Sequence, residues 1–304
     1  MNEPAPRRTV AVGAGTLAVL AWSFGPIFVR EVGASTPTVA FFRMWFAQPV
    51  MITVAYLTGG RFSRDLLRRC LVPGVLFAGS LATSFASYQH TSVANATLIG
   101  AVQPAVILFV APRLFGDRSN RQQVSLAVLA FAGMVVVVLG AGDTSGAGFG
   151  GDLYALANLA IWTVYFIRVK QVRNEGTHAA AFLSGVFLVA AIVITPWALL
   201  ASDDLGSVHA RGYGFVVLMV LGPGLLGHGS MTWAQRHLDI TLASMLTLLQ
   251  PVISTLLAWM IFDESLAPVQ LVGAAIVLVA IGGIVRNAHQ ATPEVETALS
   301  VAAD

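Results

Sequence analysis

Ten apolar stretches follow one another along this chain of 304 residues, and each is about as long as a membrane-crossing helix. A helix needs about 20 apolar residues to cross the hydrocarbon core of a bilayer. Ten such helices leave room only for short connections and tails, so we expect an all-α membrane protein with ten transmembrane helices. The stretches are Thr9 to Val29, Pro37 to Thr58, Cys70 to Tyr88, Ser92 to Leu114, Val124 to Gly140, Leu153 to Val169, His178 to Ala201, Gly214 to Gln235, Ile240 to Phe262 and Pro268 to Val285.

The composition agrees with a chain that lies in lipid. Only 11% of the residues are charged, whereas a soluble domain carries about 25%. The single cysteine, Cys70, excludes an intramolecular disulfide and a zinc site built from cysteines. The basic residues lie between the apolar stretches rather than in one patch, so we expect no nucleic-acid partner.

The distribution of the basic residues predicts the orientation. With the N-terminus in the cytoplasm, 14 of the 17 basic residues lie on the cytoplasmic side, Arg30 and Arg211 lie outside, and Arg43 lies within a span. Lys and Arg favour cytoplasmic loops. We therefore expect a multi-pass protein of the cell (cytoplasmic) membrane with both termini cytoplasmic. A cleavable signal at the N-terminus is the alternative, which the length of the first stretch disfavours.

The two halves of the chain repeat. A shift of 147 residues places Gln103 on Gln250 and Pro104 on Pro251, and a shift of 140 places Trp22 on Trp162. Each half then holds five helices, and because five is odd the second half enters the membrane from the opposite side. We expect a first five-helix repeat at residues 1–146, an inverted one at 147–286 and a disordered cytoplasmic tail at 287–304. Inverted repeats suit alternating access.

Several positions together resemble one known family. They are Trp22 in the first stretch, Arg43 early in the second, the segment from Tyr88 through Thr91, Ala94, Asn95 and Ala96 to Pro104, and the acidic steps Asp117-Arg118 and Asp263-Glu264. In their order and spacing they resemble the EamA-type families of the drug/metabolite transporter (DMT) superfamily. The resemblance implies a transporter, most often an exporter of amino acids or related metabolites. Gln103 and Gln250 depart from the glutamate that the family often carries there.

Arg43 and His228 are the most informative single residues. An isolated cation inside a span is costly and normally pairs or faces a wet cavity, so Arg43 either holds a substrate carboxylate or snorkels to the outer surface. His228 follows Gly222-Pro223-Gly224, which weakens the eighth helix. We expect a hinge there beside a binding site, with a histidine that either contacts solute or hydrogen-bonds a neighbouring helix.

Other candidates are amide, aromatic and hydroxyl side chains in the spans. Tyr154, Asn158, Trp162 and Tyr165 share one helical face, which indicates cavity lining, with Tyr154 alternatively in the interfacial aromatic belt. Ser244 belongs to a stripe of small residues that alternatively serves helix packing. The candidate substrate-binding residues are Trp22, Arg43, Tyr88, Asn95, Gln103, Asn158, Trp162, Tyr165, His228, Ser244 and Gln250.

No sequence motif indicates an enzyme, a metal site, a cofactor or an ATPase. The expected function is a secondary transporter that exports small metabolites such as amino acids by alternating access, with a small-molecule solute and the lipid bilayer as partners. The alternatives are efflux of drugs or cationic compounds, and a non-transporting membrane protein. The sequence leaves the oligomeric state open, a homodimer included.

Overall fold

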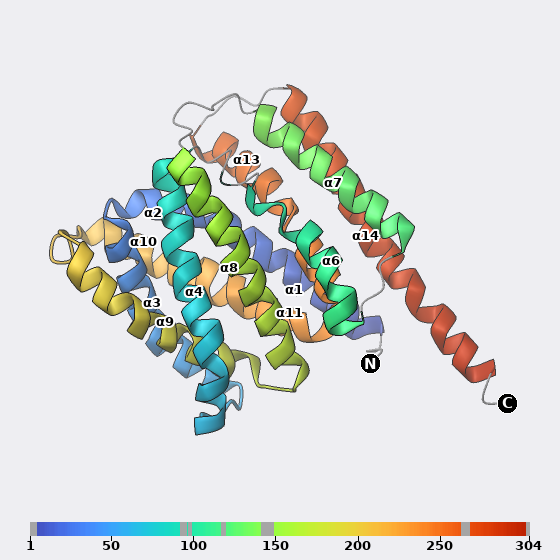
Figure 1. Cartoon of the computed structure of the whole chain (residues 1–304), viewed down its shortest axis with the longest axis horizontal. Helices are drawn as coiled ribbons and strands as arrows, with labels where there is room; N and C mark the ends of the chain where they lie inside the picture. The colour runs from blue at the N-terminus through green and yellow to red at the C-terminus, as the bar shows by residue number, and fades with distance from the viewer. Residues whose placement is uncertain are drawn as a thin grey trace.

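The computed structural model describes residues 5–91, 96, 99–116, 120–140, 149–262 and 268–301, and the regular structure within these ranges is helical throughout (Figure 1). The helices are α1 Ala5–Ser23, α2 Gly25–Val32, α3 Thr36–Leu57, α4 Arg64–His90, α6 Gln103–Phe115, α7 Arg121–Gly140, α8 Phe149–Asn174, α9 Ala179–Ala201, α10 Ala210–Met219, the π-helix η1 Val220–Gly229, α11 Ser230–His237, α12 Ile240–Leu246, α13 Leu249–Phe262 and α14 Pro268–Val301.

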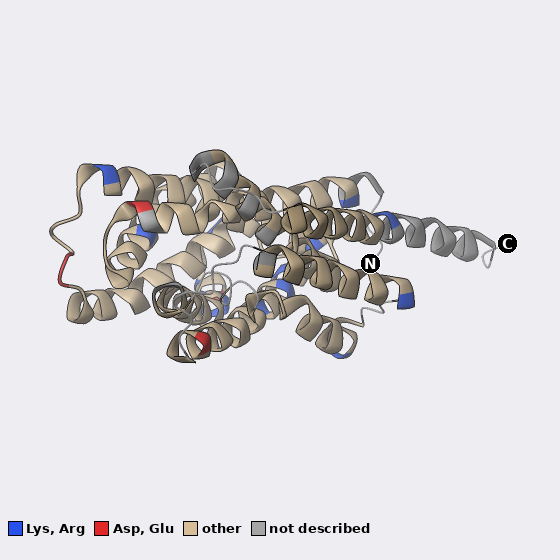
Figure 2. Ribbon diagram, turned by 90° about the horizontal axis from the view of Figure 1, so that it is seen from above, with Lys and Arg blue, Asp and Glu red and all other residues tan. Residues whose placement is uncertain are grey.

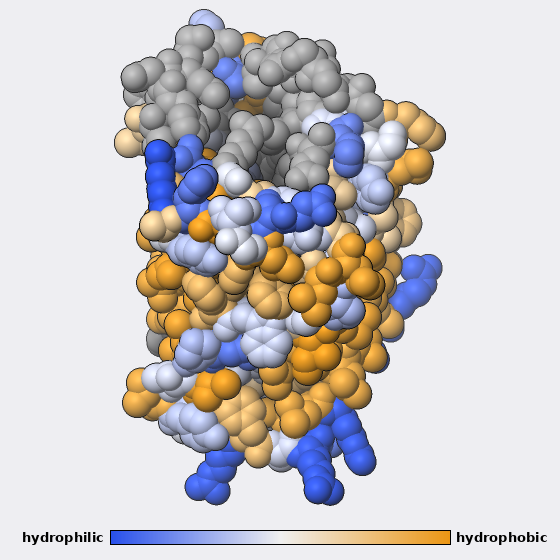
Figure 3. Space-filling view, turned by 90° about the vertical axis from the view of Figure 1, so that its left-hand side faces the viewer, coloured by the Kyte–Doolittle hydropathy of each residue, from blue (hydrophilic) through white to orange (hydrophobic). Residues whose placement is uncertain are grey.

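Six helical segments are long and apolar enough to cross a membrane, and two shorter helices are also apolar. The six are Arg8–Val29, Thr36–Leu57, Arg64–Ser87, Ala179–Ala201, Ala210–His237 and Pro268–Arg286, and the shorter two are Gln103–Phe115 and Arg121–Val137. Charged residues are sparse along the ribbon in Figure 2, and hydrophobic side chains cover much of the face seen in Figure 3. The fold is therefore that of an all-helical membrane protein.

Local signals set where several helices begin and end. Ser63 accepts a hydrogen bond from the amide of Leu66, 3.1 Å away, and so caps the N-terminus of α4. His178 caps α9 in the same way through the amide of Ala181. Gly116 ends α6 with a φ of 71°, a left-handed conformation that glycine adopts without steric cost.

Helices that are far apart in sequence pack in pairs. α3 packs against α9, α4 against α8, and α7 against α14, while α1 packs along η1 and α11. In the α7–α14 pair, Gly133 and Gly273 face one another so closely that a Cβ atom on Gly273 would lie 2.7 Å from the carbonyl oxygen of Gly133. Such close backbone approach is the role of small residues in membrane helix pairs.

Four apolar stretches are not single regular helices in the described part of the chain. The first stretch breaks at Phe24, between α1 and α2, the fourth breaks at Ala101 and Val102, just before α6, and the ninth breaks at Thr247 and Leu248, between α12 and α13. In the eighth, the predicted weakness at Pro223 takes the form of a ten-residue π-helix. Proline lacks an amide hydrogen and clashes with the preceding turn, which disrupts the α-helical bonding pattern.

Helix α14 continues past the last span. It reaches Val301 and so includes residues 287–301, for which the sequence predicts a disordered tail. Alanine and glutamate in this segment are good helix formers, which accounts for the difference.

Candidate functional site

An aromatic cluster surrounds His228 where η1 meets α1, α4, α8 and α9. The imidazole centroid lies 4.9 Å from the ring of Phe77, 5.1 Å from that of Trp22, and 5.9 Å from those of Trp162 and Phe187. His228 is buried, as are Trp22, Phe77 and Phe187. We call these five residues the His228 cluster. It joins helices from both halves of the sequence.

The two tryptophans that match under the 140-residue shift meet in this cluster. Trp22 and Trp162 form an edge-to-face pair with ring centroids 5.8 Å apart, the arrangement that aromatic quadrupoles favour. Tyr165 packs on Trp162 at 5.0 Å and on Phe77 at 5.3 Å. Trp22, Trp162, Tyr165 and His228, predicted separately as site residues, therefore lie together.

Glycine lets Trp22 approach η1. A Cβ atom on Gly227 would lie 2.5 Å from the Cδ1 of Trp22, a distance that real Cβ contacts do not reach. The close approach of η1 to Trp22 therefore requires a residue without a side chain at this point. Short π-helical segments often occur at functional sites, which agrees with the position of His228 in the last turn of η1.

Arg43 is buried in α3 with an incomplete set of partners. Its side chain is 6% exposed and its Nε lies buried with no hydrogen-bond partner. The ion pairs between described residues all involve other cations. Helix α3, which carries Arg43, packs against η1, which carries His228. Because the guanidinium is buried, it does not snorkel to the outer surface.

Two further predicted residues carry buried donors without partners. The indole Nε1 of Trp22 and the side-chain Nε2 of Gln103 are both unpaired in the structure. A buried donor without a partner costs about 1–3 kcal/mol. Together with the Nε of Arg43, they are the groups of the predicted site that a polar solute could satisfy.

The other predicted residues divide into two groups. Asn158 accepts a hydrogen bond from Ser80 at 2.8 Å and so joins α8 to α4, and the hydroxyl of buried Ser244 bonds the carbonyl of Thr241 in its own helix. These two side chains serve packing in this structure. Gln250 is half-buried at the start of α13, where its carbonyl lies 3.5 Å from the hydroxyl of Ser23.

Two predicted residues cannot be assessed. Asn95 lies outside the described residues, and only the backbone of Tyr88 is described, within α4. Tyr154, the first residue of the predicted stripe on α8, is exposed and lies 6.0 Å from the ring of His90, ring centroid to centroid. It therefore stands apart from the His228 cluster.

Sequence reasoning missed Phe77 and Phe187. Both are almost fully buried and their rings stack 5.1 Å apart beside His228. The chain contains 17 phenylalanines, and nothing in the apolar spans marks these two. Only the packing of α4 against α9 brings them to the cluster.

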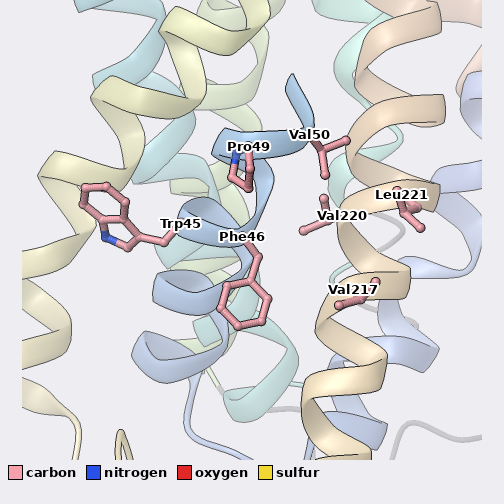
Figure 4. Close-up of a pocket in the computed structure, with 7 residues that line it drawn as sticks. All are labelled: Trp45, Phe46, Pro49, Val50, Val217, Val220 and Leu221. Atoms are coloured by element: carbon pink, nitrogen blue, oxygen red, sulfur yellow. The ribbon is translucent and has the colours of Figure 1, made fainter. Parts of the chain in front are cut away.

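A groove between α3 and the α10–η1 segment has a different character (Figure 4). It encloses about 280 Å³ and is lined by Trp45, Phe46, Pro49, Val50, Val217, Val220 and Leu221. Its side chains are apolar except for the indole N–H of Trp45, which already donates to the hydroxyl of Thr195 at 3.0 Å. Trp45, Val217 and Leu221 are exposed on the outer surface of the bundle. The lining therefore offers little to orient a polar solute.

A carboxylate fastens the N-terminus of α3 to the α9–α10 connection. Asp204 accepts hydrogen bonds from the amide and hydroxyl of Ser35, at 2.6 and 2.7 Å, and from the hydroxyls of Ser202 and Thr38. Partial burial opposes its ionisation, but these donors outweigh the burial and hold the pKa of Asp204 well below its usual range. We call these four residues the Asp204 clasp.

At the other end of the bundle, two cations of α8 bind the end of α11. The Nζ of Lys170 lies 2.7 Å from the carbonyl oxygens of Gln235 and Leu238, and the Nε of Arg173 lies 2.9 Å from that of Thr232. Both side chains are buried. Nearby, Arg69 joins α4 to the connection after α8 through an ion pair with Glu175.

Fold and site together define a membrane protein of many helices with a buried aromatic centre and a buried, incompletely paired cation. Comparison with known proteins narrows this class. A family model described as the EamA-like transporter family matches residues 9–139 and 149–286. These segments make up most of the chain, so the chain belongs to the EamA-like transporter family, which confirms the resemblance seen in the sequence.

Individual relatives agree with this assignment. An uncharacterized transporter of Archaeoglobus fulgidus is 23% identical over 83% of this chain and 87% of its own length. The aromatic amino acid exporter YddG of Ancylobacter novellus is 29% identical over 57% of this chain and 60% of its own. The pseudopaline exporter CntI of Pseudomonas aeruginosa is 24% identical over 87% of this chain and 93% of its own length.

A solved crystal structure has a similar fold. It superposes with a TM-score of 0.76 at 20% identity, and the match covers 90% of this chain and 97% of the other. The family match and the apolar helices together make the chain a multi-pass membrane protein of a transporter family.

Proposed function

We propose that this protein exports small amphipathic metabolites, amino acids first among them, across the cytoplasmic membrane. The observation that carries the proposal is the buried guanidinium of Arg43, with an unpaired Nε, on the helix α3 that packs against η1 and so against the segment that carries His228. A charged side chain at the centre of a span costs about 2.5–3.5 kcal/mol. A solute carboxylate would offset that cost, and the aromatic rings would contact the apolar part of the solute.

The transport cycle would be alternating access between two inverted halves. The described helices support ten crossings when α1–α2, α10–η1–α11 and α12–α13 each count as one interrupted span. The family model matches two segments of similar length, which supports repeats at residues 1–146 and 147–286. In inverted-repeat transporters the solute site lies between the halves near the midplane, as the His228 cluster would. The excess of basic residues in alternate connections supports cytoplasmic termini.

Efflux of cationic compounds is the second candidate. It draws support only from the aromatic rings, since cations are attracted to aromatic faces. Among the described residues, the buried polar side chains include Arg43, Lys170 and Arg173 but no Asp or Glu. A cationic solute would therefore meet a like charge at Arg43 and no counter-charge, which favours a zwitterionic or anionic solute.

The test is counterflow in proteoliposomes. Purified protein is reconstituted with unlabelled amino acids inside, and uptake of each labelled amino acid is compared with uptake of a cationic dye. We expect saturable uptake of one or more amino acids with an apolar side chain and none of the dye. Dye uptake without amino-acid uptake would reverse the choice between the two candidates, and no flux of any solute would contradict transport itself.

A pH gradient separates two modes of coupling. No acidic side chain is buried among the described residues of the spans, so a carboxylate relay has no support, and His228 is the titratable group of the cluster. Flux that responds to an imposed pH gradient in the parent but not in His228→Gln would assign proton coupling to His228. Flux that ignores the gradient in both would indicate facilitated movement down the solute gradient.

A further inference from the structure

Lys170 binds the main chain at the end of α11, through the carbonyl oxygens of Gln235 and Leu238. Helix α11 ends at His237, so the carbonyl of Gln235 has no amide donor within the helix, and Lys170 supplies one. The ammonium group also lies at the negative end of the helix dipole. These two contacts therefore hold the end of α11 in place through its main chain.

Arg173 strengthens the same contact one turn further along α8. Its Nε donates to the carbonyl of Thr232, and its side chain is 3% exposed. Its Nη1 is buried with no partner. Two cations on one helix thus hold the last two turns of α11, and both would have to release it for α8 and α11 to separate at this end.

The contact lies on the same pair of helices as the His228 cluster. Lys170 is eight residues beyond Trp162, or about 12 Å along the helix axis, and Gln235 is seven beyond His228, or about 10 Å. Trp162, Phe166 and Lys170 are four residues apart and share one face of α8. A solute bound at the cluster therefore lies next to the helices that Lys170 joins.

The sequence repeat supplies a counterpart for Lys170. Arg30 stands eight residues beyond Trp22, as Lys170 stands eight beyond Trp162. The counterpart of α11 is α4, because His90 and His237, the last residues of these helices, are 147 apart. The next residues, Thr91 and Leu238, are both extended.

The two helix ends also share a hydrogen bond. The amide of Thr91 bonds the carbonyl of Ser87 at 2.8 Å, and that of Leu238 bonds the carbonyl of Ala234 at 2.9 Å. The end of α4 therefore has the same main-chain pattern as the end of α11, to which Lys170 binds.

The two equivalent helix pairs differ in this structure. α8 and α11 are in contact, whereas α2, which carries Arg30, packs on α10 rather than on α4 in the described part of the chain. Phe28 of α2 lies 6.1 Å from the ring of Phe215 in α10. The α8–α11 pair is thus closed, whereas α2 has its main contact with α10 and the end of α4 lies against Gly151 and Asp152 of α8. Alternating access requires two gates that are not closed in the same way at the same time.

We propose that Lys170 and Arg173 form the cytoplasmic gate, and that Arg30 closes the outer end on the last turn of α4 when Lys170 releases α11. The inference rests on the proposed function, because it assumes that the two ends open in turn. The inference does not depend on which solute is transported. The opening of each gate is measured by the labelling of a reporter cysteine rather than by solute flux.

The reporters are Thr232→Cys in α11 and Ser84→Cys in α4, each placed in a Cys70→Ser background. Thr232 is 3% exposed at the closed end, and Ser84 is half-buried toward the other. A membrane-impermeant maleimide is added to inside-out vesicles for Thr232→Cys and to right-side-out vesicles for Ser84→Cys. The rate of labelling measures how often each end is open.

Lys170→Met, Arg30→Met and Arg168→Met are compared in both reporters. Methionine keeps the unbranched apolar stem and removes the charge. Arg168 is the matched control, because it lies on α8 but is exposed and bonds Gln171. We expect Lys170→Met to raise the Thr232→Cys rate severalfold and lower the Ser84→Cys rate. We expect Arg30→Met to do the reverse and Arg168→Met to change neither.

Opposite shifts of the two reporters separate a gate from a structural role. A variant that merely loosens the fold would raise both rates, and that result for Lys170→Met would overturn the proposal, as would no change in either. An Arg30→Met variant that shifts the reporters in the same direction as Lys170→Met would overturn the role of Arg30. If the two labelling rates shift in opposite directions but no solute flux is measured, the result would contradict the proposed function and still support the two gates.

Discussion

Arg43 is the residue whose environment most needs a ligand. It is buried in α3 and its Nε has no partner, so the side chain has donor capacity that the protein itself leaves unused. Arginine presents a planar fork that binds a carboxylate through two parallel hydrogen bonds, whereas lysine offers a single point charge. The two substitutions at this position therefore have different expected effects.

We expect Arg43→Ala to weaken solute binding by about ten- to a hundredfold, because hydrogen bonds to charged groups contribute about 1.5–3 kcal/mol. Arg43→Lys should keep part of the affinity. Binding to detergent-solubilised protein by calorimetry measures both, with thermal unfolding as the check on folding. Unchanged affinity in Arg43→Ala would show that the guanidinium does not contact the solute.

Asp204 gives stability that depends on pH. Its folded-state pKa lies well below that of an unfolded aspartate, which is about 3.9. Its contribution is therefore fully present above about pH 4 and is lost as pH falls from there toward the lower folded-state value. We expect Asp204→Asn to lower the melting temperature at pH 5 to 8, and the difference from the parent to shrink below pH 4. A difference that stayed constant down to pH 3 would contradict a role for the ionised carboxylate.

At the scale of elements, η1 brings His228 to the aromatic cluster. Gly227 of this segment packs against Trp22, and Pro223 lies within the π-helix. The glycines of η1 are not equivalent. A Cβ atom on Gly227 would overlap Trp22, whereas one on Gly222 would make an ordinary 3.8 Å contact with Phe28.

We therefore expect Gly227→Ala to displace Trp22 from His228 and reduce transport at least tenfold, while Gly222→Ala keeps near-parental flux. Both substitutions favour helix equally, so the difference between them isolates the steric contact. Tryptophan fluorescence provides a second measurement, since the displaced indole of Trp22 should change its emission in Gly227→Ala alone. Equal flux in the two variants would exclude this contact from the transport mechanism.

At the scale of the whole molecule, the orientation of the bundle is open to direct test. In a Cys70→Ser background, Asp203→Cys in the α9–α10 connection should react with an impermeant maleimide only from outside intact cells. Gln122→Cys, exposed at the start of α7, should react only in inside-out vesicles. This pattern follows from the excess of basic residues in cytoplasmic connections, and the reverse pattern would invert the topology and exchange the two gates.

Residues that are rare in apolar spans could be predicted as site residues, and common ones could not. Arg43, His228 and the paired tryptophans stand out because charge, imidazole and indole are costly or bulky in a bilayer. Phenylalanine is common in apolar spans, so the sequence does not distinguish Phe77 and Phe187 from the others. Only tertiary packing brings these two to His228. Likewise Gly222-Pro223-Gly224 predicts a weak point, but the extent of η1 depends on how its neighbours satisfy the displaced carbonyls.

The π-helix can also lengthen if part of it changes to α-helix. A π-helical segment is wider and shorter per residue than an α-helix, so converting part of Val220–Gly229 to α-helix would extend it and turn α11 about its own axis. Lys170 and Arg173 hold the far end of α11, and Phe28 of α2 packs against Phe215 in the middle of α10. The number of residues between Met219 and Ser230 therefore sets how α10 and α11 are placed relative to one another. Inserting or deleting a single residue there would move one of these helices away from its packing partners.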